Sequence, residues 1–105
     1  MTARDPELTA HVELRNTLYQ LRVYEAIAVA TNDVHATLDA MLGAPDADSA
    51  RRALEQRYGF TEVQATAVMD VQFRRVTALD RWKIEQRRRQ LAERVLVLEA
   101  ELGRP

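Results

Sequence analysis

Histidine is the first residue type to consider for chemistry, because its imidazole serves as a metal ligand and as a general acid or base. The chain has two histidines, His11 and His35, and no cysteine. A metal site would need a third ligand near them, and no spacing in the sequence supplies one. We therefore expect surface or packing roles for both histidines, with no metal and no cofactor.

Arginine and lysine are the next residue types to consider, because they bind nucleic-acid phosphates. Residues 80–94 contain six positive and three negative side chains; the positive ones are Arg81, Lys83, Arg87, Arg88, Arg89 and Arg94. The whole chain has a formal net charge of −1, and acids interrupt the run. Glu85 and Arg89, four residues apart, are spaced to pair along a helix. The composition favours a solvated helix face and at most weak DNA binding.

Two long helices are predicted to carry these residues. Asp5 and Pro6 are an N-cap and a first helical residue, and they predict a helix over residues 6–30. Thr77, followed three residues later by Asp80, predicts the start of a second helix over residues 78–102. Each has a narrow apolar stripe, made of Leu14, Leu18 and Leu21 in the first helix and Ile84, Leu91, Val95, Leu98 and Leu102 in the second.

Residues 33–76 are predicted to form short helices. One spans about 33–42 and is expected to bury Val34, Leu38, Met41 and Leu42. Another spans about 48–58 and ends at Gly59, which supplies the left-handed conformation of a helix end. Thr61 and Gln64 form a capping box that starts a third short helix, with Phe73 a candidate for its apolar side. This third helix is expected to fail between residues 71 and 76.

The predicted fold is all-α: one domain of 105 residues, in which an antiparallel, coiled-coil-like hairpin of long helices has a small helical head. So small a chain has a thin core, which favours an oligomer. No apolar stretch approaches the ~18 residues of a membrane span. The N-terminus lacks the basic start and apolar run of a signal peptide. We expect a cytoplasmic protein that does not enter a membrane.

The sequence resembles a known family most closely in residues 58–84, which read YGFTEVQATAVMDVQFRRVTALDRWKI. This run resembles part of the A subunit of DNA gyrase and its topoisomerase IV counterpart, and weaker similarity extends over residues 14–95. In that family a long helix leaves the DNA-cleavage core and ends in a small head, and a second long helix returns. Two heads meet to close the exit gate. Phe73 and Val76 stand where the family usually has leucines.

The resemblance implies a non-catalytic dimerisation and protein-interaction module, with a homodimer as its form. The dimer interface that it implies consists of Met69, Phe73, Val76, Leu79 and Trp82. The alternative is that these apolar residues are core within one chain, with Trp82 fastening the head to the long helices. Asp70, Arg74, Arg75 and Asp80 are candidates for interface ion pairs, within or between subunits; simple exposure is the alternative.

No enzyme activity is expected, because the resemblance covers neither the cleavage domain, with its active tyrosine, nor the DNA-wrapping domain. The sequence also has no glycine-rich phosphate loop. One alternative is a regulator that docks onto the A protein of the cell's own gyrase or topoisomerase IV. A less favoured alternative is a small helical chorismate mutase-like enzyme, whose arginines and glutamate or glutamine would come from Arg15, Arg22, Arg51, Glu55 and Gln86. Their spacing does not single out a pocket.

Overall fold

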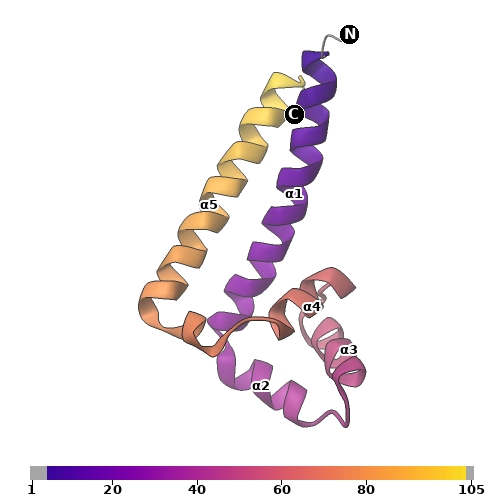
Figure 1. The fold of residues 1–105 in the computed structure, drawn as a ribbon, viewed down its shortest axis with the longest axis vertical. Coiled ribbons are helices and arrows are strands. Elements are labelled where there is room, and N and C mark those ends of the chain that lie inside the picture. Colours follow the sequence, from indigo (N-terminus) through magenta and orange to yellow (C-terminus); the bar gives the residue numbers. More distant parts are fainter. Residues whose placement is uncertain (1–4, 104–105) are drawn as a thin grey trace.

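The computed structural model describes residues 5–103, and this part of the chain is helical without strands (Figure 1). The elements are α1 (Pro6–Thr31), α2 (Val34–Leu42), α3 (Ala47–Tyr58), α4 (Glu62–Met69), a short 3-10 helix η1 (Phe73–Val76) and α5 (Ala78–Glu101). Helices α1 and α5 run antiparallel and pack together, so the start of α1 and the end of α5 lie at one end of the molecule. Helices α2, α3 and α4 form a head at the other end. The predicted all-α fold is confirmed.

A single apolar seam holds the two long helices together. Its buried members are Leu14, Leu21, Leu91, Val95 and Leu98. At the edge of the seam, the Arg94 guanidinium donates to both carboxylate oxygens of Glu13 across the helix pair, at 2.8 and 2.9 Å. This hydrogen bond lowers the pKa of the Glu13 carboxyl. The pair links the two helices outside the buried seam.

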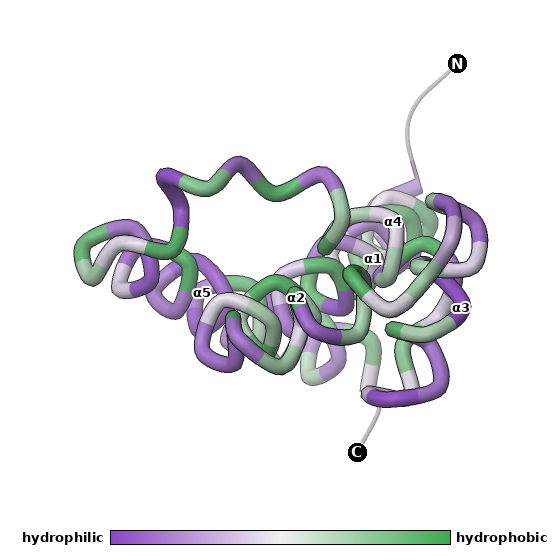
Figure 2. The backbone as a smooth tube through the Cα atoms, turned by 90° about the horizontal axis from the view of Figure 1, so that it is seen from below, coloured by the Kyte–Doolittle hydropathy of each residue, from purple (hydrophilic) through white to green (hydrophobic). Residues whose placement is uncertain are grey.

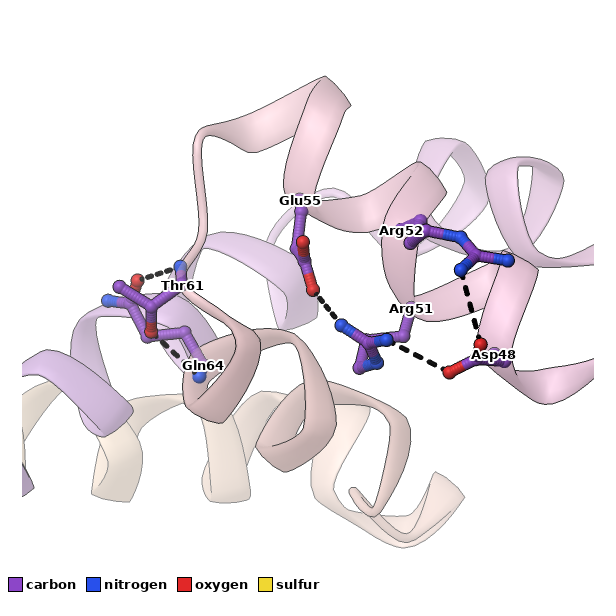
Figure 3. A network of polar contacts seen from close by, with 6 residues as sticks. All are labelled: Asp48, Arg51, Arg52, Glu55, Thr61 and Gln64. Atoms are coloured by element: carbon purple, nitrogen blue, oxygen red, sulfur yellow. Dashed lines mark hydrogen bonds and ion pairs between the residues drawn. The ribbon is translucent and has the colours of Figure 1, made fainter.

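The helix ends follow the capping signals in the sequence. Asp5 accepts a hydrogen bond from the Glu7 amide at 2.9 Å and starts α1. In the capping box of α4 the Gln64 amide donates to the Thr61 hydroxyl at 3.1 Å, and the Gln64 side chain accepts from the Thr61 amide at 2.9 Å (Figure 3). Gly59 ends α3 with a φ of 72°, a conformation that side chains disfavour. These three predicted ends are confirmed.

The head has its own small core, separate from the seam, made of Ala26, Ala30, Leu54, Ala65 and Val68. The alanines let α1 and α4 approach closely. Two polar contacts lock the head to α1 and to the α1–α2 junction. The Gln64 side chain donates to the Arg22 carbonyl at 2.7 Å, and the Tyr58 hydroxyl donates to Asp33 at 2.8 Å. The bend that follows α4 is therefore built on a fixed base.

Three details of the sequence prediction are wrong. Leu42, expected inside, is 81% exposed, because it ends α2 next to the loop at Gly43 and no further layer covers it. Helix α4 ends at Met69, earlier than expected, and Gln72 has an extended backbone just before η1. Phe73, a candidate for the apolar side of α4, therefore lies outside that helix and is exposed.

Candidate interaction surface

The bend between α4 and α5 lies at the head end of the hairpin, remote from the start of α1 and the end of α5 (Figure 1). Its segment arches away from the helices and alternates hydrophilic and hydrophobic residues (Figure 2). Thr77 closes the bend, because its hydroxyl accepts from the Asp80 amide at 3.4 Å and starts α5. Within the bend, Gln72, Phe73 and Arg74 are exposed, whereas Val71, Arg75 and Val76 are half-buried.

The structure places the five predicted interface residues on this bend and on the first turns of α5. Phe73, Leu79 and Trp82 are 76%, 61% and 59% exposed. Met69 and Val76 are half-buried, and Met69 packs against the core of the head. Large apolar side chains exposed within one short stretch of the chain make that stretch a candidate interaction site. We call Phe73, Leu79 and Trp82, with Met69 and Val76 at their edge, the bend patch.

A groove of about 320 Å³ runs beside the bend patch. One wall is α2, with Val34, Leu38 and Met41, and the other is Val68, Met69, Val71, Phe73 and Val76. Sequence reasoning missed this groove, because it assigned the α2 residues to the core. The signal was present in the sequence: α2 is apolar, but a hairpin with three short helices has no further element to cover it.

A second, polar hollow adjoins the bend and brings together the four charged residues singled out from the sequence: Asp70, Arg74, Arg75 and Asp80. The Arg74 guanidinium donates to the Gln72 side chain at 2.7 Å, and Asp80 accepts from the Thr77 hydroxyl at 2.9 Å. No ion pair joins any of the four to another side chain within residues 5–103. Their charges remain available to a partner.

The arginines of α5 are largely engaged within the chain. Glu85 accepts from Arg88 at 2.7 and 2.8 Å and from Arg89 at 3.1 Å. These bonds, with that from Arg88 the stronger, lower the pKa of the Glu85 carboxyl to about 2. Arg94 pairs with Glu13, and Arg87 donates to Gln20 at 3.3 Å. The Glu85–Arg89 pairing predicted from the sequence is confirmed, and the basic segment forms no continuous row of free cations.

DNA binding by this segment is expected to be weak. Because Arg88, Arg89 and Arg94 already have carboxylate partners, duplex binding would have to break those pairs before it released counterions. We expect a dissociation constant above about 1 µM at physiological salt, within the range of non-specific binding. Fluorescence anisotropy with a labelled duplex at several salt concentrations measures it. A submicromolar constant at physiological salt would show that the basic segment is a nucleic-acid site.

The other candidate residues do not assemble into a site in the described part of the chain. His11 and His35 are exposed on different helices, and residues 5–103 contain no cluster of three or more potential metal ligands. Arg51 pairs with Asp48 and Glu55 along α3 (Figure 3). Arg15 and Arg22, also considered for a chorismate mutase-like pocket, line a shallow hollow between α1 and α4. None of the four most pronounced hollows in residues 5–103 gathers these arginines with Glu55 and Gln86.

Fold and surface together define a helical module whose most distinctive feature is an apolar bend. Within residues 5–103, none of the helices combines the length and apolar character needed to cross a bilayer. No protein-family model matches the chain. Individual proteins do match the chain. The three described next are A subunits of DNA gyrase or of DNA topoisomerase 4, called A proteins below.

The chain is 31% identical over 93 residues to the chloroplastic/mitochondrial DNA gyrase A protein of Arabidopsis thaliana. It is 30% identical over 93 residues to the DNA gyrase A protein of Dehalogenimonas lykanthroporepellens, and 28% identical over 91 residues to the DNA topoisomerase 4 A protein of Synechocystis. These alignments cover 89%, 89% and 87% of this chain, but only 10%, 11% and 10% of the relatives. The resemblance recognised in the sequence is thereby confirmed: the chain is similar to one short segment of these A proteins.

Proposed function

We propose that this chain is a non-catalytic module that forms a homodimer through the bend patch, as a counterpart of the exit gate of the type II topoisomerase A protein. The observation that carries the proposal is the exposure of Phe73, Leu79 and Trp82 at the outer end of the hairpin. The similarity to the A proteins supports the same conclusion, because in that family the resembling bend meets its two-fold mate.

Burial of the bend patch is the driving force in this proposal. Apolar surface removed from water contributes roughly 25 cal/mol per Å². In a two-fold contact both copies bury the same patch, so each exposed side chain counts twice. Trp82 and Phe73 belong to the aromatic residues that are enriched at interface centres. The bend patch therefore has the composition of an interface core.

The four charges of the polar hollow would form the rim of the same contact. Asp70 and Asp80 of one copy can face Arg74 and Arg75 of the other. Such rim pairs add little affinity, since exposed ion pairs contribute about 0–1 kcal/mol. They fix the register of the two copies and disfavour partners of the wrong charge.

The first test is the mass of the protein in solution. We expect a dimer at about 100 µM, well above a micromolar dissociation constant, with dissociation on dilution. Sedimentation equilibrium over a wide concentration range measures both. A monomer at every concentration would exclude a homodimeric module.

The second candidate function is a regulator that docks onto the A protein of cellular gyrase or topoisomerase IV. The observation that favours it is the similarity itself, since a bend that resembles the bend of the A protein can take the place of one copy. Mixing the chain with a purified A protein of the same cell and measuring the mass of the mixture separates the two candidates. A mixed complex supports the regulator, and an unchanged homodimer supports the free module.

The purified chain is expected to show no relaxation or cleavage of supercoiled DNA and no ATPase activity. The reason is that the chain spans about a tenth of the length of the A proteins it matches, and its residues provide no phosphate-binding loop. A plasmid relaxation assay with Mg²⁺ and ATP, and a phosphate-release assay, measure these activities. Turnover by this chain alone in either assay contradicts the assignment.

A further inference from the structure

Helix α2 has an apolar face that the rest of the described chain, residues 5–103, covers only in part. Val34, Leu38 and Met41 are only half-buried, and Thr37 alone among the α2 residues is fully buried. These apolar side chains form one wall of the groove beside the bend. Because exposing apolar surface to water is unfavourable, covering the groove with an apolar partner would lower the free energy.

The two threonine hydroxyls of the groove are already hydrogen-bonded within the chain, and most of its other lining residues are apolar, so it offers few hydrogen bonds to an occupant. The Thr31 hydroxyl donates to the Ile27 carbonyl at 2.8 Å, and the Thr37 hydroxyl donates to the Asp33 carbonyl at 2.9 Å. Gln72, at the rim, already accepts from Arg74. The occupant that fits is therefore an apolar side chain.

We propose that Phe73 of a second copy of this chain occupies the groove, and that the contact is reciprocal. This inference rests on the proposed dimer and names the contact at its centre. A cavity of about 150 Å³ holds a benzene ring, so a groove of about 320 Å³ has room for a phenyl side chain and the residues around it. Phe73 itself lines its own groove, and its side chain is 76% exposed. A two-fold axis passing beside the rim lets each phenyl ring enter the groove of the other copy.

Charge favours a second copy over another partner. The polar hollow shares Val71 and Gln72 with the groove, so a molecule seated in the groove also meets the hollow. That hollow holds two acids, Asp70 and Asp80, and two arginines, Arg74 and Arg75. A surface with equal numbers of both signs is complementary to its own copy. A strongly acidic or strongly basic partner would meet repulsion from half of these charges.

Phe73→Ala tests the inserting side chain. Truncating an aromatic side chain seated in a partner's pocket commonly costs tenfold or more in affinity, so we expect the dimer dissociation constant to rise at least about tenfold. Leu42→Ala is the matched control, because Leu42 is equally exposed in the head but does not line the groove. The control is expected to leave the constant unchanged. Sedimentation equilibrium measures both, and circular dichroism checks that both variants stay helical.

A disulfide test locates the contact directly, and it is clean because the chain has no cysteine. A tagged Leu38→Cys chain is mixed with an untagged Gln72→Cys chain, which keeps Phe73 in place. Leu38 lines the groove, and Gln72 directly precedes the Phe73 that enters this groove from the other copy. Mild oxidation should therefore give a cross-linked heterodimer. Leu42→Cys in place of Leu38→Cys should not cross-link.

The outcomes separate this inference from the proposed function. A wild-type monomer overturns both. A wild-type dimer that neither weakens with Phe73→Ala nor cross-links through Leu38 overturns the insertion of Phe73 and leaves the dimer standing. Weakening by Phe73→Ala together with the cross-link supports the insertion.

Discussion

The double variant Val76→Asp plus Leu79→Glu is expected to be a monomer under conditions in which the wild-type chain is a dimer. Val76 lines the groove and Leu79 is exposed on the first turn of α5. In the proposed contact, position 76 lines the groove that receives Phe73 of the other copy, and position 79 lies in the bend patch, so both introduced carboxylates lose water when the dimer forms. Burying an unpaired charge, or placing like charges together across an interface, costs several kcal/mol, so we expect the dimer to dissociate. Light scattering measures the mass.

The other end of α5 provides a matched control. Val97→Asp plus Leu96→Glu replaces the same two residue types by the same acids, at exposed positions far along the helix from the bend. The control should remain a dimer with unchanged helicity. Circular dichroism of both variants separates loss of the interface from loss of the fold. If the two double variants dissociate equally, or if the variant in the bend stays dimeric, the dimer contact lies elsewhere.

The ends of the helices could be predicted from the sequence because they depend on local chemistry. The Thr61–Gln64 capping box and the left-handed Gly59 are decided by residues close together in the chain. The seam between the long helices follows from the spacing of Leu14, Leu21 and their counterparts on α5, since a 3.6-residue repeat places such residues on one face. A long helix at each end of a short chain then leaves a hairpin as the simplest arrangement.

The extent to which the apolar side chains of α2 are buried could not be predicted, because it depends on whether another element packs against them. The spacing of Val34, Leu38 and Met41 marks them as one face of α2, and a periodic face is ordinarily core. Whether it is covered depends on a neighbouring element, and the described chain has none at that place. The groove and the exposure of Leu42 have this same cause.

The candidate interface was predicted as a set of residues but not as a surface. Phe73, Leu79 and Trp82 were named from the resemblance, and their exposure agrees with availability to a partner. The structure brings four charged residues to one hollow: Asp70, Arg74, Arg75 and Asp80. This could not be predicted, because it depends on the path of the backbone through the bend, which no local sequence signal specifies. The dimer itself remains a prediction.

The head is expected to depend strongly on Leu54, whose side chain is completely buried among α1, α3 and α4. Leu54→Ala should lower the free energy of unfolding by about 2–5 kcal/mol, the usual cost of a leucine-to-alanine cavity. A domain of this size has a total stability of roughly 5–15 kcal/mol. The variant is therefore expected to be close to unfolding at moderate urea concentration.

Leu42→Ala removes the same atoms from an exposed position of the same head, so it should change the stability by less than about 0.5 kcal/mol. Urea titrations followed by circular dichroism, at one fixed protein concentration because dimerisation adds to stability, measure both variants. Equal losses for the two leucines would show that the head is not packed around Leu54. A large loss for Leu54→Ala alone would establish that core as the base that holds α4, and therefore the start of the bend, in place.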